Sequence, residues 1–185
     1  MEAKKLKDYF LRGSFGTCIA GIIISAISLF LFLIQFAFGF DFVIVSSIGI
    51  LFVIIGPILL VSTIKSTIKT YVLLSKLERN NSINDVYLSF TNTNENIYFN
   101  KEEIIVSDKY LFLKDNVFII PHQEITKVYT KYIKNDKREI TGVKVYCNTT
   151  KKKKIRIFSN IQTRYDLMHF VENIKQKNPS IEFKL

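Results

Sequence analysis

The chain has 185 residues, 48% of them hydrophobic, and a formal net charge of +10, a size that suits one domain with an appendage. The charges are unevenly distributed, because Asp41 is the only charged residue between Ser14 and Ile64. This segregation excludes a protein that is soluble along its whole length, and it predicts one region for lipid and another for water.

The first elements along the chain predict a membrane hairpin. Residues 1–13 are basic, and the uncharged runs 14–40 and 42–64 can form about 40 and about 35 Å of helix. Both exceed the hydrocarbon core of about 30 Å, so we expect each run to span the membrane. A signal peptide is a competing explanation of the first run, but the apolar stretch is long for one and a second run follows.

Basic residues at the ends of the two runs predict their orientation. The connection around Gly39-Phe40-Asp41 has no basic residue, whereas eight flank the outer ends: Lys4, Lys5, Lys7, Arg12, Lys65, Lys69, Lys76 and Arg79. The positive-inside rule therefore predicts a two-span protein of the cell (plasma) membrane with both termini in the cytoplasm. We expect the second helix to continue as a juxtamembrane extension over residues 65–79.

Small residues mark candidate packing faces of the two membrane helices. Thr17, Gly21 and Ser25 recur every four positions in the first run, and Gly49 and Gly56 lie seven apart in the second. Such spacing allows helix backbones to approach closely in lipid. Small residues are also common in membrane helices generally, so the sequence leaves both interpretations open.

Neither uncharged run contains Asp, Glu, Lys, Arg or His. Proton relays and ion pathways usually need such groups inside the bilayer, and two helices enclose no cavity. We therefore do not expect this protein to transport a solute by itself, although it could be a subunit of a transporter.

The remaining residues, 81–185, predict a cytoplasmic β-domain. Residues 86–90 fit either a strand or a short helix, and about six or seven short strands follow from Ile97 onward. Ile104 and Val106 alternate with their neighbours, as expected of an antiparallel sheet with one solvated face. In the turn after Leu113, Asp115 and Asn116 are the residues that tolerate the positive φ of a tight hairpin.

The chain then predicts an amphipathic helix over residues 163–177. Thr163-x-x-Asp166 is a capping box, and Asn178-Pro179 ends the helix. Its apolar stripe consists of Leu167, Met168, Val171 and Ile174. The predicted fold class is thus a membrane α-helical hairpin followed by a mainly-β (β-rich α+β) domain, in which the C-terminal helix caps antiparallel strands.

Two stretches resemble a known group of proteins. VSDKYLFLKDNVFIIPHQEITKVY and the ending IKQKNPSI are similar to the small bacterial two-span membrane proteins with a cytoplasmic pleckstrin-homology-like (PH-like) domain. The resemblance covers residues 97–185 and the hairpin. It implies two packed sheets capped by a helix. It implies little about activity, because most of these proteins have no known function and a fold does not define one.

No group of residues predicts catalysis. His122 and His169 are the only histidines, and no cysteine, histidine or carboxylate cluster has metal-ligand spacing. Cys18 lies in a membrane run, and Cys147 alternates with inward-facing valines. We expect a protein that is not an enzyme and that has no catalytic residues, metal or cofactor.

A basic run is the strongest candidate for a binding site. Lys151, Lys152, Lys153 and Lys154 are followed by Arg156, and residues 81–185 carry 18 basic and 12 acidic side chains. Basic residues near an inner leaflet bind anionic headgroups, with about 1 kcal/mol each. A basic patch also attracts nucleic acid, which is not the partner we expect. A solvated hairpin tip without a function is the remaining interpretation.

These features favour a membrane-anchored interaction or regulatory module that binds membrane lipids or a protein partner. Two alternatives remain open from the sequence: self-protection (immunity) against a membrane-active peptide bacteriocin, and an accessory subunit of a larger transporter. Homo-oligomerisation is a further possibility.

Overall fold

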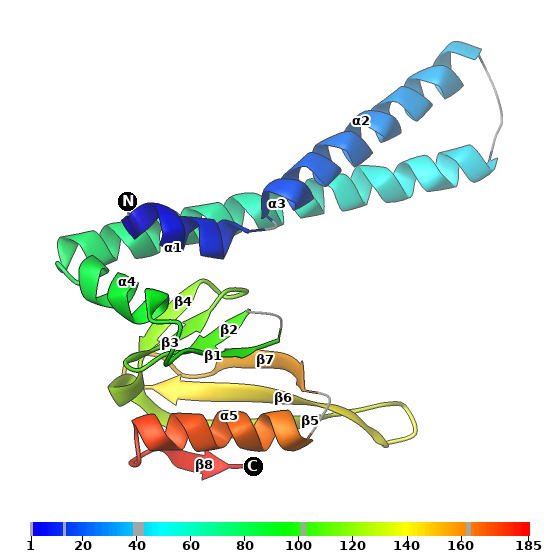
Figure 1. Ribbon diagram of the computed structural model, residues 1–185. Helices are drawn as coiled ribbons and strands as arrows, with labels where there is room; N and C mark the ends of the chain where they lie inside the picture. Colours follow the sequence, from blue (N-terminus) through cyan, green and yellow to red (C-terminus); the bar gives the residue numbers. More distant parts are fainter. Residues whose placement is uncertain (1, 13, 39–42, 101–102, 162–163) are drawn as a thin grey trace. The chain divides into compact units, whose positions relative to one another are not determined.

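The computed structural model is an α+β fold that describes residues 2–12, 14–38, 43–100, 103–161 and 164–185 (Figure 1). It divides into two compact units. One is Lys7–Lys76, and the other combines the first six residues with Leu77–Leu185, which we call the β-domain.

Long helices dominate the N-terminal part of the chain. They are α1 (Glu2–Leu11), α2 (Ser14–Phe38) and α3 (Val43–Arg79). Helix α3 runs without interruption through the predicted extension over residues 65–79, which is therefore helical. The predicted turn at Gly39-Phe40-Asp41 lies outside the described residues.

Among the residues that the structure describes, one helix, Ile54–Arg79, is long and apolar enough to cross a membrane. The bent pair Ala3–Leu11 and Gly16–Leu31 passes the same test if it counts as one span. Large apolar side chains of these helices are exposed, for example Phe30, Ile58 and Val61. Only 11% of the apolar stretch of Ile54–Arg79 is buried. Contiguous exposed apolar surface is typical of proteins that contact membranes or other proteins.

The β-domain contains two four-stranded sheets in its described residues. In the first, β1 to β4 are joined in sequence order, and in the second the order is β7-β6-β5-β8. All neighbours are antiparallel except β5 and β8. The bounds are β1 Ile97–Phe99, β2 Ile104–Val106, β3 Tyr110–Leu113, β4 Phe118–Pro121, β5 Ile125–Lys134, β6 Ile140–Thr149, β7 Ile155–Ile161 and β8 Glu182–Lys184.

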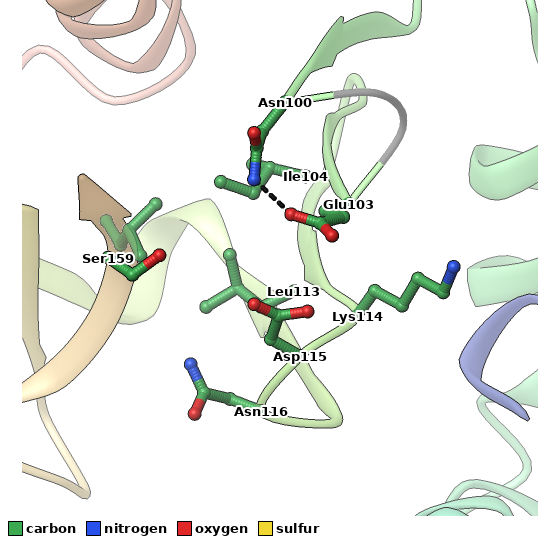
Figure 2. A pocket seen from close by; sticks show the side chains of 9 residues that line it. Asn100, Glu103, Ile104, Leu113, Lys114, Asp115, Asn116 and Ser159 are labelled. Atoms are coloured by element: carbon green, nitrogen blue, oxygen red, sulfur yellow. Dashed lines mark hydrogen bonds between the residues drawn. The ribbon is translucent and has the colours of Figure 1, made fainter. Parts of the chain in front are cut away.

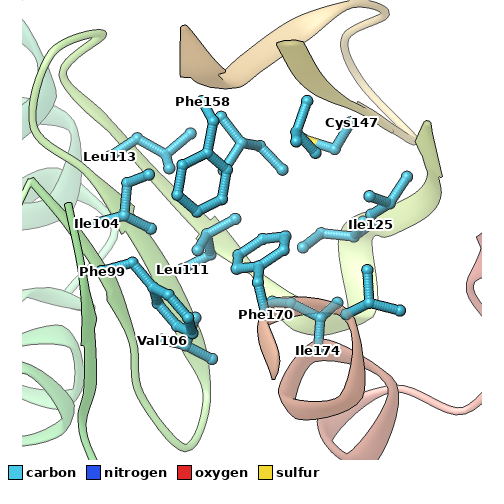
Figure 3. Packing of buried hydrophobic residues seen from close by; sticks show 14 of the residues in the cluster. Phe99, Ile104, Val106, Leu111, Leu113, Ile125, Cys147, Phe158, Phe170 and Ile174 are labelled. Atoms are coloured by element: carbon cyan, nitrogen blue, oxygen red, sulfur yellow. The ribbon is translucent and has the colours of Figure 1, made fainter. Parts of the chain in front are cut away.

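The two sheets and helix α5 (Arg164–Lys177) enclose one hydrophobic core (Figure 3). Phe170 of α5 makes edge-to-face contacts with Phe99 of the first sheet and Phe158 of the second, at ring-centroid distances of 5.5 and 5.0 Å. Such aromatic contacts add to the energy of burial. Val145 and Cys147 are fully buried here, which confirms the inward-facing alternation predicted for β6.

Helix α4 (Ile83–Thr91) resolves the ambiguity of residues 86–90 in favour of a helix. It covers the face of the first sheet that points away from the main core. Phe90 packs on Phe112 at 5.4 Å between ring centroids, and Ser89 hydrogen-bonds Ser107 at 2.7 Å. The Asp85 carboxylate accepts hydrogen bonds from Lys109 and Tyr110, both at 2.6 Å. The first sheet is therefore buried on both faces.

The structure corrects three details of the predicted β-domain. It has an additional strand, β8, which lies after α5 and pairs with β5 in parallel. Positive φ in the β3–β4 turn occurs at Val117 (54°) and not at Asp115 or Asn116. Strand β6 extends to Thr149, which still pairs with Ile125, although the sequence Asn148-Thr149-Thr150 is typical of a turn.

The C-terminal helix begins at Arg164 and ends at Lys177, close to the prediction, although the capping residue Thr163 lies outside the described residues. Its buried face differs from the predicted stripe. Phe170, Val171 and Ile174 are buried, whereas Met168 is 39% exposed. The prediction was wrong for Met168 because the face is rotated toward Phe170, which fills the centre of the core.

His122 lies in a short 3-10 turn between β4 and β5 and is 1% exposed. Its Nε2 is 2.9 Å from the carbonyl oxygen of Ser107, and its Nδ1 has no partner among the described residues. Burial lowers the pKa of the imidazole because the charged form would lose its hydration.

We expect this histidine to make the β-domain sensitive to mild acid. Because its folded pKa lies below the unfolded value of about 6.5, the unfolded state takes up a proton first. Stability is then full above about pH 6.5 and decreases as the pH falls toward the folded pKa. Urea unfolding between pH 7 and 5 should show this decrease, and His122→Gln should flatten it. An unchanged slope in His122→Gln would contradict the assignment.

Candidate functional site

The basic run predicted from the sequence forms the connection between β6 and β7. Thr149 shapes this turn: its backbone N–H donates to the Lys152 carbonyl at 2.8 Å, and its hydroxyl accepts from the Lys152 N–H at 2.9 Å. Lys154 has a φ of 59°, and its N–H donates to Asn148 Oδ1 at 2.8 Å. The basic run is therefore a hydrogen-bonded turn, and it places several lysines at the tip of one hairpin.

Two of the four lysines are engaged within the domain. Lys151 forms an ion pair with Glu124 at 2.5 Å, and the Lys152 ammonium lies 4.3 Å from the centre of the Phe118 ring. A cation over an aromatic face is held by the quadrupole of the ring. Both lysines therefore have a partner in the β4–β5 region of the same domain.

The other basic side chains of the hairpin are free. Lys153, Lys154 and Arg156 are exposed, and none of them has an ion pair or a cation–π contact in the described part of the chain. Ile155 and Ile157, which alternate with them, are buried in the core. The Asn116 side chain donates to the Arg156 carbonyl at 2.7 Å. The turn and the start of β7 thus present a row of uncompensated positive charge to solvent.

A small polar hollow lies beside β7, between the turns that follow β1 and β3 (Figure 2). Asn100, Glu103, Asp115 and Asn116 line it, and Asn100 donates a hydrogen bond to Glu103. Its volume of about 10 Å³ is near the minimum for a single water molecule. It can hold a water, and it is too small for an organic ligand.

The residues considered for catalysis are separated or buried. Cys147 is completely buried, and burial raises the pKa of its thiol to about 12, so the thiolate nucleophile is suppressed. His169 lies against the rings of Phe99 and Tyr165. No group of three or more metal-binding side chains occurs among the described residues.

Three of the five predicted packing residues meet between helices α2 and α3. A Cβ atom added to Gly56 would lie 2.2 Å from Ser25 Oγ and 3.2 Å from the Gly21 carbonyl oxygen. Ser25 donates a hydrogen bond to that carbonyl at 2.8 Å. Thr17 is half-buried outside this contact, and Gly49 falls in a stretch of α3 whose surroundings the structure does not describe. Helices α2 and α3 therefore approach closely where both lack side-chain bulk.

A larger hollow was not predicted. It has a volume of about 480 Å³ and lies between one end of the second sheet and the first turns of α5. Its lining includes Thr130, Tyr132, Val143, Arg164, Leu167 and Met168. The helical spacing of Met168 predicted a core residue, whereas Met168 is exposed and lines this groove. The sequence pattern therefore did not indicate the groove.

The class of protein that this geometry defines is a β-rich α+β domain, joined to long apolar helices, with a basic hairpin and an apolar groove. Comparison of the chain with family models, curated proteins and solved structures finds no match. Its function therefore has to be inferred from its own residues.

Proposed function

We propose that this chain is a membrane-anchored, non-enzymatic interaction module whose β-domain binds an anionic lipid surface through the β6–β7 hairpin. The observation that carries the proposal is the row of free cations at Lys153, Lys154 and Arg156. Three such residues at the inner leaflet would contribute about 3 kcal/mol. Because Lys151 contacts Glu124 and Lys152 contacts Phe118, we expect the lipid contact to be made mainly by these three residues.

The proposed anchor is a hairpin of two spans, α2 and α3, with both termini in the cytoplasm. The close approach of Gly21 and Gly56 supports antiparallel packing of the two helices in lipid. The exposed apolar side chains of both helices support lipid contact. The basic residues beyond the outer ends support the orientation.

We assign the β-domain a PH-like fold, as the sequence resemblance implied. Support comes from two stacked sheets of consecutive antiparallel strands that share one core with a C-terminal helix. Strand β8 is an addition to the pattern expected from that resemblance. The absence of catalytic function is part of the proposal, and it is supported by the burial of Cys147 and of His122.

The test is sedimentation of residues 77–185, the continuous part of the β-domain, with vesicles that contain phosphatidylglycerol. Lys153→Gln/Lys154→Gln/Arg156→Gln should weaken binding by roughly 100-fold, which corresponds to about 1 kcal/mol per cation. Added salt should weaken binding of the parent protein, because exposed charges are screened.

A matched control removes the same number of charges from another hairpin. Lys134, Lys137 and Arg138 are exposed residues at the end of the β5–β6 hairpin. Their replacement by glutamine should reduce binding only by the small non-specific effect of net charge. Equal losses in the two triple variants would contradict a specific role of the β6–β7 hairpin.

The two alternative functions predict different results. An accessory subunit of a transporter would co-purify in stoichiometric amounts with a larger membrane protein. An immunity protein would protect cells against one membrane-active peptide, and its deletion would sensitise them to that peptide alone. Neither result is expected for a lipid-binding module.

A further inference from the structure

We propose that the second sheet has a docking site for an extended acidic peptide of a protein partner, which would add a strand to the free edge of β5 beside β8. This site is separate from the basic hairpin and goes beyond the proposed lipid contact. Its elements are the unpaired part of β5, the adjacent apolar groove and an uncompensated pair of lysines.

Strand β5 is only partly covered on the side away from β6. Strand β8 pairs with Lys127, Val128 and Tyr129, whereas no described strand pairs on that side with residues 130–134. In Figure 1 the hairpin of β5 and β6 extends beyond the other strands of its sheet. A row of unpaired backbone donors and acceptors is a template for another strand.

The chain itself shows which chemistry this edge accepts. In β8, Glu182 lies opposite Lys127, and the two side chains form an ion pair at 2.5 Å. The next residue, Phe183, pairs with Val128 and packs against the hydrophobic core. Strand β8 therefore places an acidic side chain beside Lys127 on the outer face and an apolar one on the inner face, and Lys184 follows on the outer face beside Tyr129.

The same pattern continues along β5, but without a partner. Lys131 is four residues beyond Lys127, so it lies on the same outer face. It is exposed, and its cross-strand neighbour on β6 is another lysine, Lys144. Like charges directly opposite each other are unfavourable in a sheet. Neither has an ion pair in the described structure, and an acidic residue on a strand added next to β5 would lie beside Lys131 and compensate its charge.

The inner face provides the apolar part of the site. Thr130 and Tyr132 follow Val128 at the spacing of one strand face, and both line the groove of about 480 Å³ with Leu167 and Met168. Tyr132 is 56% exposed. Arg164 at the start of α5 also lines the groove, and it adds positive charge. An occupant with alternating acidic and apolar residues matches both faces.

The test uses the full-length chain in detergent and a fluorescent eight-residue peptide of alternating glutamate and valine. We expect saturable binding and slower amide hydrogen exchange at residues 131–134. Lys131→Glu should weaken binding at least about tenfold and should gain binding of the matching lysine–valine peptide. Lys175→Glu, an equal charge change on an exposed position of α5, should leave both affinities within about twofold.

Backbone methylation separates strand addition from other modes of binding. Peptides N-methylated at alternate residues in one frame should lose binding, while the other frame retains it, because only one frame points its N–H groups at β5. Equal binding of both frames, or no saturable binding, would overturn the proposal. Saturable palmitate binding without peptide binding would assign the groove to an acyl chain and would also overturn it.

Discussion

Phe170→Ala is expected to lower the free energy of unfolding of the β-domain by about 3–5 kcal/mol, the usual loss for a buried phenylalanine. The side chain is 0% exposed and touches aromatic rings from both sheets. Its removal would leave a cavity where α5 joins the sheets, and the surrounding residues belong to three different elements. Urea titration with pulse proteolysis of the full-length chain in detergent measures this change.

Tyr165→Ala is the matched control on the same helix. Tyr165 is 76% exposed, so truncation of this ring should change stability by about 0.5 kcal/mol or less. A similar loss of unfolding free energy in both variants would contradict the prediction that Phe170 holds α5 against the core.

Gly56→Leu is expected to separate helices α2 and α3. A methyl group at this position already overlaps Ser25 Oγ and comes within 3.2 Å of a backbone carbonyl of the facing helix. Overpacking of this kind costs about 1–3 kcal/mol. Spin labels at Ile22 and Val61, both exposed, would report the separation as a longer and broader distance distribution.

Three variants control this experiment. Gly16→Leu introduces the same side chain where nothing lies within 4 Å of the added Cβ, so the distance distribution should stay narrow. Gly56→Ala should be milder, since the serine side chain can rotate, and Ser25→Gly should rescue it. A broad distribution in Gly16→Leu as well would rule out a specific contact at Gly56.

Much of the fold could be predicted because its signals are local. Uncharged runs predicted the long helices, and alternation of buried and exposed residues predicted the strands from Ile97 to Ile161. The stop at Asn178-Pro179 predicted the end of α5. These patterns depend on neighbours a few residues apart, and such neighbours can be read directly from a sequence.

Strand β8 and the groove could not be predicted, because both depend on contacts between residues that are far apart in the sequence. The three residues Glu182–Lys184 form a strand only because β5, about fifty residues earlier in the chain, offers them an edge. Met168 fits an apolar stripe by spacing, but its exposure depends on how α5 is rotated against both sheets. Tertiary packing decides both features.

The basic run illustrates the limit for the candidate site. The sequence shows four equivalent lysines followed by an arginine. The structure divides them, because Glu124 and Phe118 approach the turn from distant parts of the chain. Only the tertiary structure shows which of these basic residues have a partner and which do not.

The most direct test of the proposed function places an environment-sensitive fluorophore on the β6–β7 turn of the full-length protein in lipid nanodiscs. Thr150→Cys in a Cys18→Ala background labels this exposed turn and retains every cation, while the buried Cys147 stays unmodified. We predict a blue-shifted emission in discs with phosphatidylglycerol that reverses with salt and disappears in the Lys153/Lys154/Arg156 glutamine variant. The same emission in discs of phosphatidylcholine alone, or in that variant, would contradict lipid binding by the hairpin.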